Sequence, residues 1–183
     1  MKRFNKSVIA SLMVCVFGVY LNAEEIPGVV KRHYMRNDVA VGAEAYFLGA
    51  NGWNVNLRYF PLDWLYIKGA YGSEELDVWE GSVEYDYTSA AFGAATAGYD
   101  LFTLFLEVYY RMPMNEKISG FYETSVDSYV GVNIGMGVFL SDNWTLDFTL
   151  GFFSAPKLTE RGYNEEEDIA PFTAGISATY FFR

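Results

Sequence analysis

Apolar and polar residues alternate along most of the chain from Asp38 onward. Between positions 126 and 140, Val130, Val132 and Ile134 share one parity, and mostly small or polar residues occupy the positions between them. Successive side chains of a strand point to opposite faces, so a period of two predicts β-strands. The same period recurs in the segments 38–47, 53–59, 65–71, 83–98, 104–111, 126–140, 144–152 and 172–182. The pattern therefore predicts eight strands, with the assignment of faces least regular at 90–97.

The connections between these strands alternate in length. Three are short, at positions 61–63, 99–102 and 141–143, and three are long, at positions 73–82, 112–125 and 154–168. The first outer connection, at positions 49–52, departs from this rule because it is also short. An even number of antiparallel strands of ~9–11 residues, with short turns at one end and longer loops at the other, is typical of membrane barrels. We predict an all-β fold, an eight-stranded antiparallel up-and-down transmembrane β-barrel.

A soluble, lipocalin-like barrel would show the same alternation, and the two differ in which face is apolar. A soluble barrel turns its apolar face inward and carries charge outside. Here the less apolar face is mostly Gly, Ser, Thr and Asn with single charges, which suits a polar interior and a lipid-facing exterior. Aromatic residues also gather at the end with the short turns, as they do where a barrel meets the membrane interface. These are Tyr59, Trp64, Tyr99, Trp144 and Phe182.

The first residues have the tripartite pattern of a signal peptide. Lys2, Arg3 and Lys6 precede an apolar run at 8–20, and Ala23 is a small residue before a plausible cleavage site. The alternative, a retained membrane anchor, needs a span of ~20 residues, and this run is shorter. We predict a cleaved signal peptide at 1–23, a periplasmic N-terminal leader at 24–37 and the barrel at 38–183. The single cysteine, Cys15, lies in the part removed, so the mature chain has no disulfide.

The last strand carries a second localisation pattern. Its polar, glycine, apolar and aromatic positions are Thr173, Gly175, Ala178, Tyr180 and Phe182. This strand resembles the C-terminal assembly signal of bacterial outer-membrane β-barrels, although Arg183 follows the aromatic end. The chain from 38 to 182 resembles the small eight-stranded barrels of the OmpX and OmpA transmembrane-domain type. The resemblance implies an outer-membrane location, contact with membrane lipid and lipopolysaccharide, and insertion by the barrel-assembly machinery.

Six charged residues have the parity of the interior face. Three are acidic and three are basic: Glu44, Glu107 and Asp147, and Arg58, Lys68 and Arg111. Unpaired charges in a confined interior are costly, so we expect an ion-pair network. Eight strands leave an interior just wide enough for side chains, which favours a salt-bridge plug over the gate of a pore.

Acidic residues dominate two of the long connections that we expect to face the cell exterior. The first carries Glu74, Glu75, Asp77 and Glu80, and the second carries Glu160, Glu165, Glu166, Glu167 and Asp168. Such residues gather divalent cations or a basic partner, although acidic loops are ordinarily only solvated. Phe121, Tyr122 and Tyr163 favour an extracellular protein partner, because aromatic residues are enriched at interfaces. The net charge of −10 disfavours nucleic acid as a partner.

Candidates for catalysis are scarce. The only histidine, His33, precedes the first strand, and we identify no cofactor or metal site. The glycines Gly131, Gly135 and Gly137 lie within an alternating strand, so they are expected to make room in the interior and not to bind phosphate. We predict a non-enzymatic protein with a structural or adhesin-like role exerted through its acidic outer loops. A narrow pore or small-solute channel is the alternative, and a lipid-modifying outer-membrane enzyme comes after it.

Overall fold

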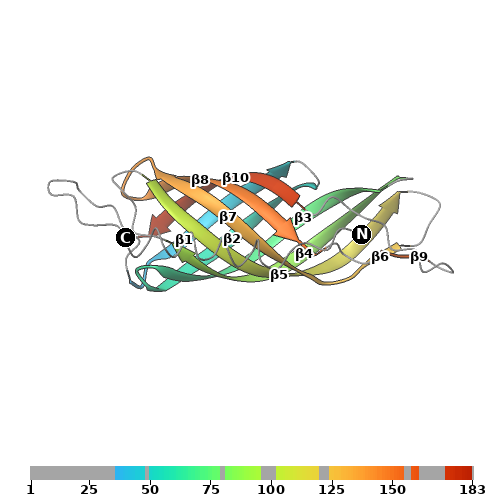
Figure 1. Cartoon of the computed structure of the whole chain (residues 1–183), viewed down its shortest axis with the longest axis horizontal. Coiled ribbons are helices and arrows are strands. Elements are labelled where there is room, and N and C mark those ends of the chain that lie inside the picture. Colours follow the sequence, from blue (N-terminus) through green and yellow to red (C-terminus); the bar gives the residue numbers. More distant parts are fainter. Residues whose placement is uncertain are drawn as a thin grey trace, which may run out of the picture.

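The computed structural model describes residues 36–47, 50–78, 81–95, 102–119, 124–154, 158–160 and 172–182. Within them, eight antiparallel strands close into a barrel, and two short strands pair with each other beside it (Figure 1). The barrel strands are β1 (Val39–Phe47), β2 (Asn51–Leu62), β3 (Leu65–Val78), β4 (Gly81–Ala95), β5 (Phe102–Ser119), β7 (Tyr129–Phe139), β8 (Trp144–Phe153) and β10 (Phe172–Phe182). The separate pair consists of β6 (Thr124–Val126) and β9 (Leu158–Glu160). The predicted fold class is confirmed.

The first and last strands close the barrel. β1 pairs with β10 along its whole length, from Val39 opposite Phe182 to Phe47 opposite Ala174. The other strands pair with their neighbours in chain order, as in an up-and-down barrel. No helix in these described segments is long and apolar enough to cross a lipid bilayer.

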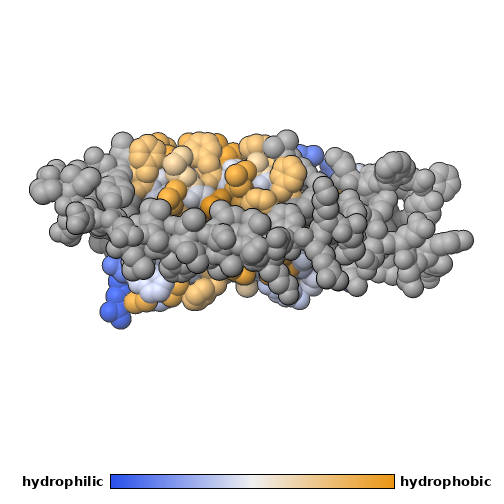
Figure 2. Space-filling model, in the orientation of Figure 1, coloured by the Kyte–Doolittle hydropathy of each residue, from blue (hydrophilic) through white to orange (hydrophobic). Residues whose placement is uncertain are grey.

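The exterior of the barrel is apolar and the interior is polar at mid-height. On β2, Trp53, Val55 and Leu57 are each about half exposed, whereas Asn54 and Asn56 between them are buried. In Figure 2, hydrophobic side chains occupy much of the barrel wall that is visible beside the grey atoms. These faces are the reverse of those of a soluble barrel, which excludes the lipocalin-like alternative.

Aromatic side chains form a girdle at the end of the barrel with the short turns, called here the inner end. Tyr59, Trp64, Trp144 and Phe182 are all exposed there. The ring of Tyr180 lies edge-on between two of them, with its centroid 5.0 Å from that of Trp144 and 5.2 Å from that of Phe182. Tyr99 lies outside the described residues. The girdle matches the position expected for a membrane interface.

At the opposite, outer end, β3, β4 and β5 continue well beyond the other strands (Figure 1). Their pairing runs without a break to Val78 opposite Gly81 on one side, and reaches Ser82 opposite Ser119 on the other. Residues 73–78, 81–88 and 112–119 are called here the outer sheet. The predicted loops at 73–82 and 112–125 are therefore wrong over most of their length. The predicted turn at 49–52 is also too long, because β2 begins at Asn51.

The reason for this error is a change of phase in the alternation. Inside the membrane belt the apolar residues of β3, such as Ile67 and Tyr71, face outward. In the outer sheet the apolar residue Leu76 is fully buried, and the outward position next to it is the exposed Glu75. A strand that leaves lipid for water must turn its polar side outward, so a single apolar parity cannot follow it.

Two aromatic layers enclose the polar middle of the interior. The inner layer contains Ala40, Phe60, Tyr66, Ala95, Phe105, Phe139 and Phe181. The outer layer contains Tyr46, Ala50, Leu76, Val83, Tyr85, Tyr87, Ala91, Tyr109, Val126, Tyr129 and Phe153. In the inner layer the ring of Phe60 lies 5.3 Å from that of Tyr66 and 5.9 Å from that of Phe181.

Glycines make room for these inward-facing rings. A Cβ atom on Gly131 would lie 2.1 Å from Cζ of Tyr109, which stands directly opposite on β5. Gly93 has the same relation to Tyr66 on β3, and Gly135 to Phe105 on β5. Each ring therefore lies over a backbone position that only glycine can occupy without displacing it. This agrees with the interpretation of these glycines as spacers in the interior.

Candidate functional site: the charged interior and the outer sheet

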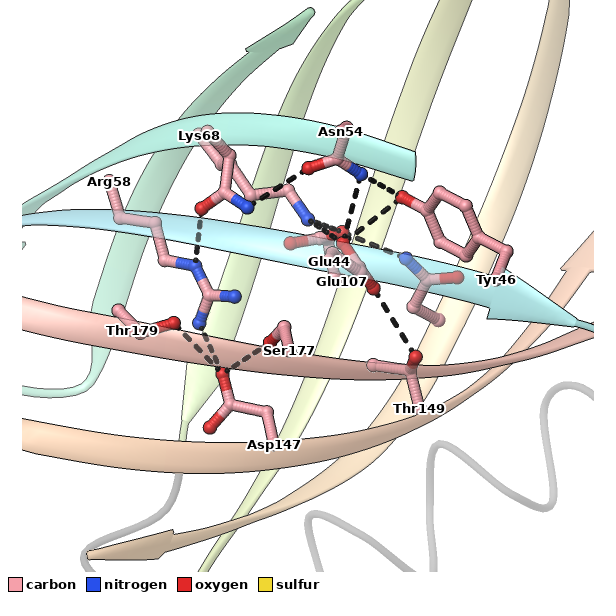
Figure 3. A network of polar contacts seen from close by, with 12 residues as sticks. Glu44, Tyr46, Asn54, Arg58, Lys68, Glu107, Asp147, Thr149, Ser177 and Thr179 are labelled. Atoms are coloured by element: carbon pink, nitrogen blue, oxygen red, sulfur yellow. Dashed lines mark hydrogen bonds and ion pairs between the residues drawn. The ribbon is translucent and has the colours of Figure 1, made fainter. Parts of the chain in front are cut away.

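The six charges expected in the interior all point inward and are buried. Arg58 on β2 and Asp147 on β8 form an ion pair, with Nη1 of the arginine 2.9 Å from Oδ2 of the aspartate. The same oxygen accepts hydrogen bonds from the hydroxyls of Ser177 at 3.1 Å and Thr179 at 3.3 Å, both on β10 (Figure 3). Three donors from two other strands therefore hold this carboxylate.

Lys68 on β3 lies between two carboxylates (Figure 3). Its Nζ is 2.7 Å from Oε1 of Glu107 on β5 and 3.7 Å from Oε2 of Glu44 on β1. One ammonium group thus serves two acids, which leaves this cluster one negative charge in excess. A buried carboxylate without enough partners would be strongly unfavourable.

Neutral donors compensate that excess charge. Glu107 accepts hydrogen bonds from the hydroxyl of Tyr66 at 3.0 Å and from the amide of Asn133 at 2.9 Å. Glu44 accepts from the hydroxyl of Tyr46 at 3.0 Å, from the amide of Asn54 at 3.1 Å and, on its other oxygen, from Thr149 at 3.3 Å. All four carboxylate oxygens of the pair are therefore bonded, as a stable buried network requires.

A second ion pair lies nearer the outer end, and sequence analysis missed half of it. Arg111 on β5 pairs through Nη1 with Oε2 of Glu74 on β3, and both side chains are buried. The same oxygen accepts hydrogen bonds from the hydroxyls of Tyr85 and Tyr129, each at 2.9 Å. The prediction that Glu74 belongs to an exposed acidic loop is wrong. Its parity, shared with Lys68 on the same strand, is the signal that would have placed it inside.

Four tyrosine rings surround the Arg111 guanidinium. Its Cζ lies 4.1 Å from the ring centre of Tyr87 and between 5.0 and 5.5 Å from those of Tyr46, Tyr109 and Tyr129. Each distance is within the range of a cation–π interaction, and burial strengthens such contacts. The outer aromatic layer is thus built around the charge of Arg111, which contacts tyrosine rings of its own strand and of three others, β1, β4 and β7.

The other acidic residues that were predicted in loops either lie in strands or fall outside the described residues. Glu75 is exposed on β3, Asp77 belongs to β3 and Glu160 to β9, so these residues lie in strands and not in loops. Several other predicted positions lie outside the described residues: Glu80, Glu165, Glu166, Glu167, Asp168, Phe121, Tyr122, Tyr163 and His33. Among the side chains that are described, no group of three or more His, Cys, Asp or Glu residues is placed to hold a metal ion.

The residues of the expected assembly signal occupy β10 with the predicted faces. Thr173 and Gly175 are buried in the interior, whereas Ala178 and Phe182 are exposed and Tyr180 is half-buried. Ile176 is also exposed. The strand therefore presents one apolar side to the exterior while pairing with β1 and β8.

Comparison with known proteins shows the fold. No protein-family model matches the chain, and no curated protein matches its sequence. The outer membrane protein OprG from Pseudomonas aeruginosa is 10% identical, with 84% of this chain and 100% of that chain covered at a TM-score of 0.57. Neisserial surface protein A is 13% identical, with 79% and 94% covered at 0.54. A de novo designed transmembrane β-barrel is 11% identical, with 82% and 99% covered at 0.53. The chain has the fold of the small transmembrane β-barrels of outer membranes.

Proposed function

We propose that this protein is a non-conducting, non-enzymatic outer-membrane barrel that anchors the outer sheet at the cell surface. The apolar belt and the aromatic girdle support insertion in a bilayer. The likeness to OprG and to Neisserial surface protein A supports the outer membrane as that bilayer. The extension of three strands beyond the belt supports a role exerted outside the membrane.

The filled interior is the observation that carries the proposal. An ion crossing the barrel would meet the inner aromatic layer, then the bonded charges of Arg58, Lys68, Glu107 and Asp147, then the ring of tyrosines around Arg111. Eight strands leave space only for such side chains. Opening a path would require separating buried ion pairs, at a cost of about 3–5 kcal/mol for each pair broken. The interior is therefore better suited to stability than to transport.

Neither alternative role is favoured by a specific contact. A selective pore needs a ring of charge facing water, but the described interior charges of this chain are buried in ion pairs and hydrogen bonds. A lipid-modifying enzyme would need a base near the outer rim. The only histidine precedes β1, whose first residue lies at the inner end of the barrel.

Recording of single-channel currents in planar bilayers tests the proposal. Purified, folded wild-type protein should give no discrete conductance steps. Conductance steps that disappear in Arg58→Ala or Glu107→Ala would overturn it, because those side chains would then belong to a conducting path.

The mass of lipid A from cells that express the protein should also be unchanged, and a new acylation or deacylation product would contradict the non-enzymatic role.

A further inference from the structure

We propose that the outward face of the outer sheet binds a cationic amphipathic peptide segment of another protein. This inference rests on the proposed function, because it needs the outer sheet to stand in water at the cell surface. The face is defined by Glu75 on β3, Glu84 and Asp86 on β4, and Met112 and Met114 on β5. Three observations on the sheet lead to this surface and to this kind of partner.

The inner face of the outer sheet already has a partner. Leu76, Val83 and Tyr85 are almost completely buried, and Val126 of β6 belongs to the same cluster. β6 in turn pairs with β9. A new ligand on the inner face would have to displace a formed core, which makes this face unsuitable for docking.

The free edge of the sheet is protected against strand addition. β5 pairs with β7 as far as Arg111 opposite Tyr129, and among the described residues its continuation pairs only with β4. That continuation contains Pro113, which has no backbone N–H to offer. It also contains a register shift opposite Glu84 and Asp86, where Asn115 takes a positive φ of 51°. Proline and bulges are the devices by which natural edge strands avoid pairing with another chain.

The outward face is exposed, and three carboxylates lie on it. Glu75 and Glu84 are both exposed and stand directly opposite each other on β3 and β4. Like charges directly opposite each other on neighbouring strands destabilise a sheet. Asp86 adds a third carboxylate, which accepts a hydrogen bond from Asn115 at 3.4 Å. A basic ligand would relieve the repulsion that the sheet carries alone.

The basic side chains that the structure describes lie elsewhere. Arg58, Lys68 and Arg111 are buried in the interior, and Arg36 precedes β1 at the inner end. In the backbone register, Lys117 of β5 lies opposite Glu84. The described side chains of the face therefore carry a net negative charge, which favours a cationic ligand over anionic lipopolysaccharide.

Two methionines supply the apolar part of the surface. Met112 is 39% exposed and Met114 36% exposed, and they lie opposite Thr88 and Asp86 of β4. Methionine is flexible and polarisable, and it is common on surfaces that accept varied apolar side chains. Carboxylates beside exposed methionines match a peptide that alternates basic and apolar residues.

Binding of a synthetic peptide to the full-length folded protein tests this inference. The probe is a fluorescent ten-residue peptide of alternating lysine and leucine, with peptides carrying serine or glutamate in place of lysine as comparisons. The protein is held in phosphatidylcholine nanodiscs, and empty nanodiscs give the background. The test variant is Glu75→Gln with Glu84→Gln. The control variant, Asp63→Asn with Asp142→Asn, removes two exposed charges at the inner end.

We expect the lysine peptide to bind wild type and the control variant with equal affinity. The Glu75→Gln/Glu84→Gln variant should bind it about five- to tenfold more weakly and with a smaller salt dependence, as loss of two surface ion pairs implies. Exchange of Met112 and Met114 for serine should also weaken binding. The inference would be overturned if all variants bound the lysine peptide equally, or if wild type bound the serine and glutamate peptides as tightly as the lysine peptide. A correctly folded barrel that shows no conductance steps and does not bind the lysine peptide refutes only this inference. Conductance steps refute the proposed function.

Discussion

Glu74 and Glu75 are neighbours in sequence but lie in opposite environments. Glu74 points inward, where Arg111, Tyr85 and Tyr129 all bond to one of its carboxylate oxygens. Glu75 points outward into the region above the membrane belt, opposite Glu84. The two residues have the same chemistry, so the difference between them comes only from the alternation of the strand.

This pair gives a prediction at the scale of a single residue. Glu74→Gln leaves the Arg111 guanidinium buried without a counter-charge, and we expect the free energy of unfolding to fall by about 3 kcal/mol. Glu75→Gln should change it by less than about 0.5 kcal/mol, as is usual for exposed positions. Urea unfolding in lipid vesicles, followed by tryptophan fluorescence, measures both values. Equal effects of the two substitutions would show that Glu74 is not the buried partner of Arg111.

Residue-scale chemistry also explains which parts of the charged interior were predictable. Parity alone assigned Glu44, Arg58, Lys68, Glu107, Arg111 and Asp147 to the interior, because lipid outside demands apolar residues at every other position. Parity does not give the partners. The pairing of Arg58 on β2 with Asp147 on β8, three strands away around the barrel, depends on tilt and register, which no local pattern contains.

At the scale of a strand, the sequence predicted the elements that lie in the membrane better than those beyond it. All eight barrel strands follow from alternation, since lipid and interior impose opposite demands on their two faces. The alternation predicts loops for the outer sheet because the apolar positions change parity beyond the membrane belt. There Leu76 faces inward and Glu75 faces outward. β6 and β9 have only three residues each, too few to show any period.

The glycines of β7 give a prediction at this scale. Gly131→Ala would place a Cβ atom 2.1 Å from the ring of Tyr109, so either the ring or the strand must move. We expect the free energy of unfolding to fall by about 1–3 kcal/mol, the usual cost of overpacking. Gly69→Ala is the matched control, because its added Cβ would meet no atom within 4 Å. A loss of stability in the control as large as that in Gly131→Ala would contradict the assigned role of Gly131 as a spacer.

At the scale of the whole molecule, charge and hydrophobicity are sorted by environment. The belt is apolar, the interior charges are paired, and the exposed charged side chains described at the outer end, Glu75, Glu84 and Asp127, are acidic. The two ends also differ in construction, with short turns and an aromatic girdle at one end and the extended outer sheet at the other. From this asymmetry we predict one orientation in the membrane, with the outer sheet toward the cell exterior.

Cysteine labelling in intact cells tests that orientation. Cys15 is the only cysteine of the chain and lies in the predicted signal peptide, so the mature protein offers no background reaction. Asp127 is exposed at the outer end and Asp63 at the inner end. A membrane-impermeant maleimide should label Asp127→Cys in intact cells, and Asp63→Cys only after the outer membrane has been made permeable. Both variants should still migrate faster on gels before heating than after it, because the barrel remains folded. The reverse labelling pattern would place the outer sheet in the periplasm, where it could not serve as a cell-surface structure.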